Sequence, residues 1–260
     1  MKIAVAGMGL IGGSFFKAAE AAGHDVAALH HGDAGGFESA EIVLVCLPPA
    51  NIVQWIAERA ARFAKGAVVV DICGVKRPVV EAMRAVKQDG WIFVGGHPMA
   101  GKEKSGFEHS DAALFKGASM ILTPEEGTSA SVTEKLSSFF SSVGFGRTVV
   151  TDPDRHDEMI AYTSQLCHVI ATAYSRDSLK TYSDGFSAGS FADMTRIATQ
   201  DEKIWSDLFL SDRDKLLPVL DRFISRLCEF RDALDRSDGG AIREIIRSGK
   251  KCGRHEECLV

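Results

Sequence analysis

A histidine inside a glycine-rich polar segment is the residue whose type and position most directly suggest chemistry. The strand-like residues 91–94 lead into two glycines and then into His97, and the chain stays polar and rich in glycine through residues 95–111. Open α/β sheets bind their ligands just beyond the carboxyl ends of their strands, and a neutral imidazole placed there can act as a general base. A single histidine is more often an ordinary loop residue, so the neighbouring motifs decide between the two interpretations.

A second pattern, near the first residue, is typical of nucleotide binding. Residues 2–7 read as a short buried strand, and Gly7, Gly9 and Gly12 follow in the spacing Gly-x-Gly-x-x-Gly before a helix. This spacing is weak alone, but between a strand and a helix it matches the dinucleotide-binding fingerprint. The glycines permit a tight turn and a close approach of the backbone to pyrophosphate, and the free N–H groups at the helix start attract phosphates. We therefore expect the cofactor to contact this turn and the residues that follow two later strands: Gly7, Gly9, Leu10, Ile11, Gly12, Leu47, Pro48 and Cys73.

The end of the expected second strand, residues 25–29, bears on the choice between NAD and NADP. A site that prefers NAD usually has a carboxylate there, which accepts hydrogen bonds from the ribose. This chain has His30 and His31 instead, with Asp33 close behind. A 2′-phosphate then meets no repulsion and a protonated imidazole could attract it, whereas Asp33 could still fold back toward the ribose. Both cofactors stay open, with His30 and His31 as expected contacts.

Strands alternate with helices through the first half of the chain. Strand-like runs occupy residues 2–7, 25–29, 41–46, 67–72, 91–94, 119–122 and 147–150. This alternation predicts an α/β fold, with a Rossmann-type, doubly wound and mostly parallel sheet. The strand pattern stops where Asp152 and Pro153 provide an N-cap and a first helical residue. We therefore expect a dinucleotide-binding domain at residues 1–151 and an all-helical domain at residues 152–260.

The helical half adds polar residues in otherwise apolar surroundings. Ser164, Gln165 and His168 share one face of the expected first helix. A buried polar group needs a partner or a ligand, so this face predicts either helix–helix hydrogen bonding or a binding site. Arg196 and Trp205 follow on two shorter helices. The many apolar residues farther along predict burial against a second subunit, and thus a homodimer formed through the helical domain.

Composition excludes several kinds of partner. The chain has 260 residues and a net charge of −5, which gives no general attraction to nucleic acid or to an anionic membrane. No apolar run approaches the roughly 20 residues of a membrane span. Six cysteines in a chain of this length are typical of reduced thiols in the cytoplasm. Cys252, His255 and Cys258 lack two further ligands at a matching spacing, so no metal site is expected.

Four stretches together resemble the prephenate and arogenate dehydrogenases of tyrosine biosynthesis. They are GMGLIGGS at 7–14, HPMAGKEKSG at 97–106, DRHDEMIAYTSQLCH at 154–168 and TRIATQDEKIW at 195–205. The resemblance covers essentially the whole chain, and the second stretch is the most specific. It implies an NAD- or NADP-dependent oxidoreductase that converts prephenate to 4-hydroxyphenylpyruvate by oxidative decarboxylation. Arogenate, which would give tyrosine directly, is the alternative substrate, and some enzymes of this kind accept both.

The resemblance also implies roles for individual residues. His97 matches the histidine that binds the ring hydroxyl and takes its proton. Arg196 matches the arginine that holds a substrate carboxylate, and Glu103 matches an acidic residue that guards the pocket. The remaining substrate contacts that it implies are Gln165, His168 and Trp205. Gln165 replaces a histidine found in some relatives.

One departure from the family pattern concerns the catalytic histidine itself. Some members have a serine after strand 67–72, beside that histidine, whereas this chain has Gly74 next to Cys73. The departure puts any hydroxyl support for His97 in doubt.

The choice between prephenate and arogenate depends on charge near the substrate side chain. A carboxylate there would favour the ammonium group of arogenate. Gln200 is uncharged, although Asp201 adjoins it, and this composition favours the keto acid prephenate.

Two further classes fit parts of the sequence. A β-hydroxyacid dehydrogenase or imine reductase would also pair a nucleotide domain with helices, but the hydroxyacid enzymes usually place a catalytic lysine on the interdomain helix, and residues 155–179 contain none. A non-catalytic nucleotide sensor would leave His97 and Arg196 without a role.

Overall fold

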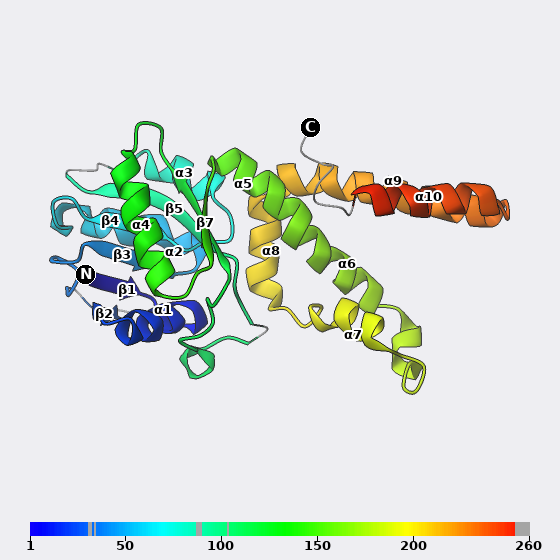
Figure 1. Cartoon of the computed structure of the whole chain (residues 1–260), viewed down its shortest axis with the longest axis horizontal. Coiled ribbons are helices and arrows are strands. Elements are labelled where there is room, and N and C mark those ends of the chain that lie inside the picture. The colour runs from blue at the N-terminus through cyan, green and yellow to red at the C-terminus, as the bar shows by residue number, and fades with distance from the viewer. Residues whose placement is uncertain (31–32, 34, 87–89, 103, 253–260) are drawn as a thin grey trace. The chain divides into compact units, whose positions relative to one another are not determined.

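The computed structural model describes residues 1–30, 33, 35–86, 90–102 and 104–252 (Figure 1). His31 and Glu103, two of the expected site residues, lie outside the described residues, and so do His255 and Cys258. The chain divides into two compact units, Met1–Asp212 and Arg213–Val260. The first unit contains all the strands described below.

A seven-stranded sheet forms the centre of the first unit, with the order β2-β1-β3-β4-β5-β6-β7. Every neighbouring pair is parallel except β5 and β6, which are antiparallel. The doubly wound, mostly parallel sheet predicted from the sequence is thus confirmed. The strands are β1 (Lys2–Ala6), β2 (Asp25–Leu29), β3 (Ile42–Val45), β4 (Val68–Asp71), β5 (Ile92–Pro98), β6 (Ser119–Pro124) and β7 (Arg147–Val150).

Helices cover both faces of the sheet and create two separate apolar cores (Figure 1). On one face α1 (Leu10–Ala21) and α4 (Ala130–Ser142) bury phenylalanines, among them Phe15 and Phe140. On the other face α2 (Pro49–Arg59) and α3 (Arg77–Met83) pack against the sheet. Every residue of β3 and β4 is buried. That pattern explains their continuous apolar sequences, because a parallel strand covered on both faces has no solvent side.

Strand β5 is longer than its sequence predicts, because it includes His97 and Pro98. The two residues pair with Ile121 and Met120 of the antiparallel strand β6. The apolar pattern ends at residue 94, but hydrogen bonds to a strand more than twenty residues later keep the backbone extended. His97 therefore lies within the sheet, near the end of a strand, rather than in the loop beyond it.

Helices continue the first unit after the sheet. They are α5 (Pro153–Ile160), a π-helical turn η3 (Ala161–Gln165), α6 (Leu166–Ser175), a 3-10 turn η4 (Ser178–Tyr182), α7 (Gly189–Arg196) and α8 (Glu202–Ser211). Helix α5 packs on α3 and β6, so the compact unit extends past residue 151. The division into a nucleotide domain and a substrate domain at that residue stays a prediction. The second unit contains α9 (Arg213–Asp235) and α10 (Gly239–Cys252), which pack on each other.

The described residues offer neither a membrane-spanning helix nor a metal-binding cluster. Within the described ranges, no helix has both the length and the apolar character needed to cross a membrane. Among the same residues, no cluster of three or more His, Cys, Asp or Glu side chains is arranged to hold a metal ion.

Candidate active site

His97 is held at the carboxyl edge of the sheet by a backbone that only glycine permits just before it. A Cβ atom at Gly96 would lie 2.7 Å from atoms of both Met120 and Val70, and 2.8 Å from the carbonyl oxygen of Asp71. Those contacts are closer than real Cβ atoms show, so β5 can approach β4 and β6 at this point only without a side chain. The close approach fixes the backbone from which the His97 side chain extends.

The His97 imidazole contacts a second histidine from a distant part of the chain. Its Nδ1 atom lies 2.9 Å from Nε2 of His156, in hydrogen-bonding geometry. His156 lies on α5, which begins as the sequence predicted: Asp152 accepts a hydrogen bond of 2.8 Å from the N–H of Arg155, and Pro153 is the first helical residue. The start of this helix therefore fixes where the second imidazole lies.

Asp157 continues the chain of polar contacts. Its Oδ1 atom lies 2.7 Å from Nδ1 of His156, and it accepts a hydrogen bond of 2.8 Å from the backbone N–H of Lys76. Its Oδ2 atom accepts another of 2.8 Å from the backbone N–H of Arg77. His156 is 2% exposed and Asp157 is fully buried. The carboxylate thus joins α5 to the connection between β4 and α3.

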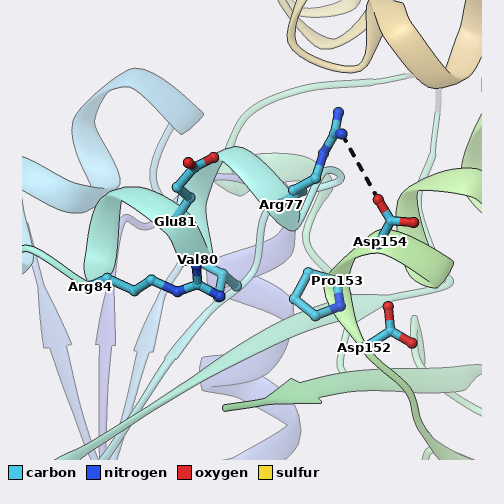
Figure 2. A pocket seen from close by; sticks show the side chains of 7 residues that line it. All are labelled: Arg77, Val80, Glu81, Arg84, Asp152, Pro153 and Asp154. Carbon is cyan, nitrogen blue, oxygen red and sulfur yellow. Dashed lines mark ion pairs between the residues drawn. The ribbon is translucent and has the colours of Figure 1, made fainter. Parts of the chain in front are cut away.

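Figure 2 shows the outer side of this junction, where α3 faces the start of α5. Arg77 and Asp154 form an ion pair of 3.9 Å, and both line a surface pocket together with Arg84 and Asp152. Charges of both signs surround this pocket. The ion pair adds a second link between α3 and α5, the helix that carries His156, the partner of His97.

A buried ion pair lies on the other side of the same connection. Lys76 and Asp71 are both fully buried, and the Lys76 ammonium group donates hydrogen bonds to the Asp71 carboxylate and, at 2.7 Å, to the carbonyl oxygen of Gly96. Asp71 also accepts a hydrogen bond of 3.0 Å from the backbone N–H of Cys73. The pair therefore fixes the ends of β4 and β5 relative to each other, next to His97.

These surroundings keep the two imidazoles neutral. Burial, followed by the nearby His156 and the positive charge of Lys76, lowers the pKa of His97 well below its ordinary value of 6.5. Burial also lowers the pKa of His156, although its hydrogen bond to Asp157 acts in the opposite direction. Burial raises the pKa of the Cys73 thiol to about 11, so this cysteine is a poor nucleophile. A neutral imidazole is the form that can accept a proton.

His168 and Trp205 lie together at a separate pocket of about 410 Å³. Their rings stack with centroids 3.5 Å apart and planes inclined by 30°. Lys102 and Lys104 of the loop after β5 also line the pocket. Since the loop and helices α6 and α8 are far apart in the sequence, folding brings together three of the predicted stretches here.

Two polar side chains beside this pocket differ in how their hydrogen bonds are used. Gln200 donates a hydrogen bond of 2.7 Å from Nε2 to the hydroxyl of Thr172, and its buried Oε1 atom has no hydrogen-bond partner among the residues that the structure describes. Asp201 accepts a hydrogen bond of 2.8 Å from the N–H of Ile204 and thereby caps α8. The amide of Gln200 can therefore still accept a hydrogen bond, whereas one carboxylate oxygen of Asp201 is occupied by the helix.

The structure does not bring all the expected substrate residues to this pocket. Gln165 is 2% exposed and donates a hydrogen bond of 3.0 Å to Asp212 at the end of α8, which is the helix–helix contact that the sequence left open as an alternative. Arg196 is exposed at the end of α7, and neither it nor His97 is among the residues that line the pocket within the described chain. Leu208, one turn after Trp205 on α8, lies close to Gly74, as does Nε2 of His97. The assigned roles of Gln165 and Arg196 stay predictions.

The glycine turn has the geometry that a dinucleotide requires. A Cβ atom at Gly12 would lie 1.8 Å from the carbonyl oxygen of Gly7, so this position tolerates no side chain. At Gly9, which precedes α1, a Cβ atom would meet nothing within 4 Å. One glycine is thus required by packing, and the other leaves the backbone open to an approaching phosphate.

The other expected cofactor contacts lie along the same edge of the sheet. Leu10 and Ile11 are the first residues of α1, Leu47 and Pro48 follow β3, and Cys73 follows β4. Because β1, β3 and β4 are adjacent and parallel, these residues follow the carboxyl ends of neighbouring strands.

Asp33 folds back on the end of β2. Its carboxylate accepts a hydrogen bond of 2.7 Å from the backbone N–H of His30. The residue His30 is exposed. A carboxylate therefore does lie near the position that usually contacts the ribose of NAD.

His156, Asp157, Lys76 and Asp71 were not among the expected site residues. One signal could have indicated the first two, since a His-Asp pair precedes the buried Ile160 on the apolar side of an amphipathic helix. A buried histidine beside a carboxylate is a common arrangement for orienting an imidazole. Nothing local in the sequence indicated that Lys76 would be buried.

Known proteins resemble this chain over nearly its whole length. Residues 11–149 match the family model of the prephenate dehydrogenase nucleotide-binding domain, and residues 152–248 match that of the prephenate dehydrogenase dimerization domain. The chain is 32% identical to the cyclohexadienyl dehydrogenase of Zymomonas mobilis, over 96% of this chain and 94% of that protein. It is 29% identical to the prephenate dehydrogenase of Bacillus subtilis, over 83% of this chain and 59% of that longer protein.

Solved structures share the fold. Synechocystis arogenate dehydrogenase superposes with a TM-score of 0.82 at 21% identity, covering 96% of this chain and 98% of that one. The prephenate dehydrogenase of Aquifex aeolicus, in complex with hydroxyphenyl propionate and NAD+, gives 0.80 at 24% identity, covering 96% of each chain.

Proposed function

Because the chain belongs to the prephenate dehydrogenase family, we propose that it converts prephenate to 4-hydroxyphenylpyruvate by oxidative decarboxylation with NAD or NADP. The observation that carries the proposal is a neutral, partly buried His97 at the carboxyl edge of a nucleotide-binding sheet. The glycine turn supports the cofactor assignment, since Gly9 leaves open space where a phosphate would approach.

The reaction needs a base for one proton and an acceptor for one hydride. Prephenate carries a hydroxyl at C4 of its ring and a carboxylate at the opposite ring carbon. His97 takes the hydroxyl proton as the C=O bond forms, and a nicotinamide held at the glycine turn would supply the acceptor for the hydride from C4. The C–C bond to the ring carboxylate then breaks, CO2 leaves, and its electron pair makes the ring aromatic. The phenolate recovers the proton from His97, so the imidazole ends the cycle neutral.

Positioning of the substrate falls to the helical residues. Arg196 holds one carboxylate, because a guanidinium group can bind both of its oxygens at once. Trp205 and His168 form one wall of the pocket that receives the substrate side chain, and the family resemblance assigns Glu103 the role of guarding it. Gln165 contributes indirectly, because its hydrogen bond to Asp212 links the turn η3 to the end of α8. Since aromatisation drives the reaction, the enzyme contributes mainly by alignment.

Prephenate rather than arogenate is the proposed substrate. The two differ at the side chain, which is a keto acid in prephenate and carries an ammonium group in arogenate. Gln200 at the pocket is uncharged, and the carboxylate of Asp201 already accepts a hydrogen bond as the cap of α8. Gln200 therefore offers no negative charge to an ammonium ion, and one oxygen of Asp201 is already used by the helix cap.

The proposed assembly is a homodimer that forms through the helical region. The family model that matches residues 152–248 describes a dimerization domain. Helix α9 exposes a series of large apolar side chains, namely Leu217, Ile224, Leu227 and Leu234. Sedimentation at micromolar concentration tests this assembly, and a monomeric mass would contradict it. The free thiols of Cys46, Cys73, Cys167 and Cys228 fit a cytoplasmic location.

A four-way assay tests the reaction directly. Prephenate or arogenate is mixed with NAD or NADP, and the absorbance of the reduced nicotinamide is followed. We expect reduction with prephenate, and the position of Asp33 favours NAD over NADP. Folded protein that is silent in all four mixtures would contradict the proposal, and binding of the cofactor without turnover would favour a nucleotide sensor.

A further inference from the structure

We propose that His156 and Asp157 are positioning residues that fix the tautomer of His97, so that its Nε2 atom is the one that takes the substrate proton. The inference deepens the proposed function and rests on it for the identity of the substrate. It assigns a role to two buried side chains on α5. His156 contacts the base through a hydrogen bond, Asp157 contacts His156, and neither is required to touch the substrate.

The direction of the hydrogen bonds from His97 through His156 follows from Asp157, the acceptor in which this series ends. An ionised carboxylate can only accept hydrogen bonds. The contact of 2.7 Å between Asp157 and Nδ1 of His156 therefore has the proton on that nitrogen. In a neutral His156 the Nε2 atom is then an acceptor. The contact of 2.9 Å to His97 must be donated by Nδ1 of His97, and the Nε2 atom of His97 is left with a free lone pair.

The other contacts of Asp157 keep this direction from reversing. Its two oxygens accept the backbone N–H groups of Lys76 and Arg77 at 2.8 Å each. A backbone N–H group can only donate, so both oxygens of Asp157 act as acceptors here. The ammonium group of Lys76 does not compete for Asp157, because it binds Asp71 and the carbonyl oxygen of Gly96. Asp157 is thus kept as an acceptor by backbone groups that cannot change their role.

The free Nε2 atom lies near Gly74, just beyond the carboxyl end of β4. A Cβ atom at Gly74 would be 3.8 Å from this nitrogen and 3.5 Å from the side chain of Leu208 on α8. The family resemblance implies a serine at this place in some relatives, whereas Gly74 offers no hydroxyl. The orientation of His97 must then come from its other nitrogen. The pair His156–Asp157 provides that orientation from the opposite side of the ring.

A pair of substitutions at one position separates positioning from mere packing. In His156→Gln the amide oxygen can accept from Nδ1 of His97 while the amide N–H donates to Asp157. His156→Met has a similar length but can do neither. We expect His156→Met to lower kcat roughly 100-fold, as for a misplaced catalytic group, with little change in KM. We expect His156→Gln to restore most of that loss.

His24 provides the matched control. It is also a hydrogen-bonded histidine, with Nε2 2.8 Å from the hydroxyl of Ser142, but it lies at the start of β2. His24→Met should leave kcat unchanged. Equal activity of the wild type, His156→Met and His156→Gln would overturn the inference, and so would an equal loss in both folded variants.

A measurement without substrate keeps the inference separate from the proposed reaction. The ¹⁵N NMR shifts of the His97 ring report which nitrogen carries the proton. At neutral pH the wild type should have the proton on Nδ1, and His156→Met should shift population toward protonated Nε2. A wild-type proton on Nε2 would overturn the inference even if His156→Met failed to fold. Protein that shows the expected tautomer but does not oxidise prephenate would contradict only the proposed function.

Discussion

The surroundings of His97 and the pocket beside Trp205 differ in how completely their polar groups find hydrogen-bond partners within the folded chain. Around His97, Asp157 and Lys76 are fully buried and their polar atoms bind identified partners. At the pocket, the buried amide oxygen of Gln200 has no hydrogen-bond partner among the described residues. The difference indicates that folding alone sets the geometry of proton transfer, whereas substrate completes the recognition site. Changes in the first region should therefore affect kcat or stability, and changes in the second should affect selectivity or KM.

The largest effect is expected from removing the base. His97→Asn keeps a polar side chain but loses the nitrogen that accepts the proton, so kcat should fall roughly 10²- to 10⁴-fold. KM should change far less, because the base acts mainly in the transition state. Steady-state kinetics with prephenate measure both. His109→Asn, in the same loop region, is the control. Comparable losses of kcat in the two variants would contradict the assignment of His97 as the base.

The buried ion pair should dominate stability in the first region. Lys76→Met leaves the carboxylate of Asp71 buried without its cation, a change that typically costs about 3–5 kcal/mol. Lys203→Met removes an exposed pair with Asp207 and should cost about 0–1 kcal/mol. Urea unfolding of both variants makes the comparison. Similar free energies of unfolding would show that the network near His97 is not what stabilises the end of the sheet.

The two glycines of the nucleotide turn should separate folding from cofactor binding. Gly12→Ala forces a carbon against the carbonyl oxygen of Gly7 and should lower Tm by several degrees, as expected for about 1–3 kcal/mol of overpacking. Gly9→Ala meets no neighbour, so Tm should stay constant while the Kd for the cofactor rises. A Gly9→Ala variant that binds NAD+ and NADP+ like the wild type would indicate that the phosphates lie elsewhere.

The pH dependence should reflect the lowered pKa of His97. Because the free base must be neutral and its pKa lies well below 6.5, kcat/KM should be flat near neutral pH and fall only well below 6.5. The free energy of unfolding should also decrease as the pH falls. The unfolded chain binds a proton at about 6.5 and the folded chain does not, so unfolding becomes easier as pH falls through that value toward the folded pKa. An acid limb at or above 6.5 in kcat/KM would contradict the assignment of the base.

The smallest effect is expected at the substrate pocket. Gln200→Glu adds a negative charge where an ammonium group of arogenate could lie, so the ratio of kcat/KM for arogenate to that for prephenate should rise roughly tenfold, or 1.4 kcal/mol. The kcat for prephenate should change little, because Gln200 does not contact His97 or His156. A large loss of kcat with no change in selectivity would assign Gln200 to the first region instead.

The sequence predicted the features that depend on local patterns. The alternating elements, the glycine turn and the helix start at Asp152–Pro153 are all encoded within a few residues of where they occur. Each of these features forms because of residues that are neighbours in the sequence, such as an N-cap carboxylate followed by proline. The position of His97 at the carboxyl edge was predictable for the same reason.

The partners of His97 could not be predicted in the same way. His156 is 59 residues away in sequence, and Asp212 is 47 residues from Gln165. Their pairing depends on how helices pack against the sheet, which no local pattern states. The π-helical turn just before α6 is a further example, because it requires tertiary packing to favour the extra residue. The residues that could do chemistry were predicted from their residue types. Their hydrogen-bond partners were found only in the folded structure.

A crystal structure with NAD+ and 4-hydroxyphenylpyruvate tests the central claim most directly, since it shows whether His97 and Arg196 serve one ligand. The account predicts the phenol oxygen about 2.6–3.2 Å from Nε2 of His97, with the Arg196 guanidinium on the ligand carboxylate and the nicotinamide against the same ring. A ligand whose phenol points away from His97, or a structure in which His97 and Arg196 open onto different surfaces, would contradict it.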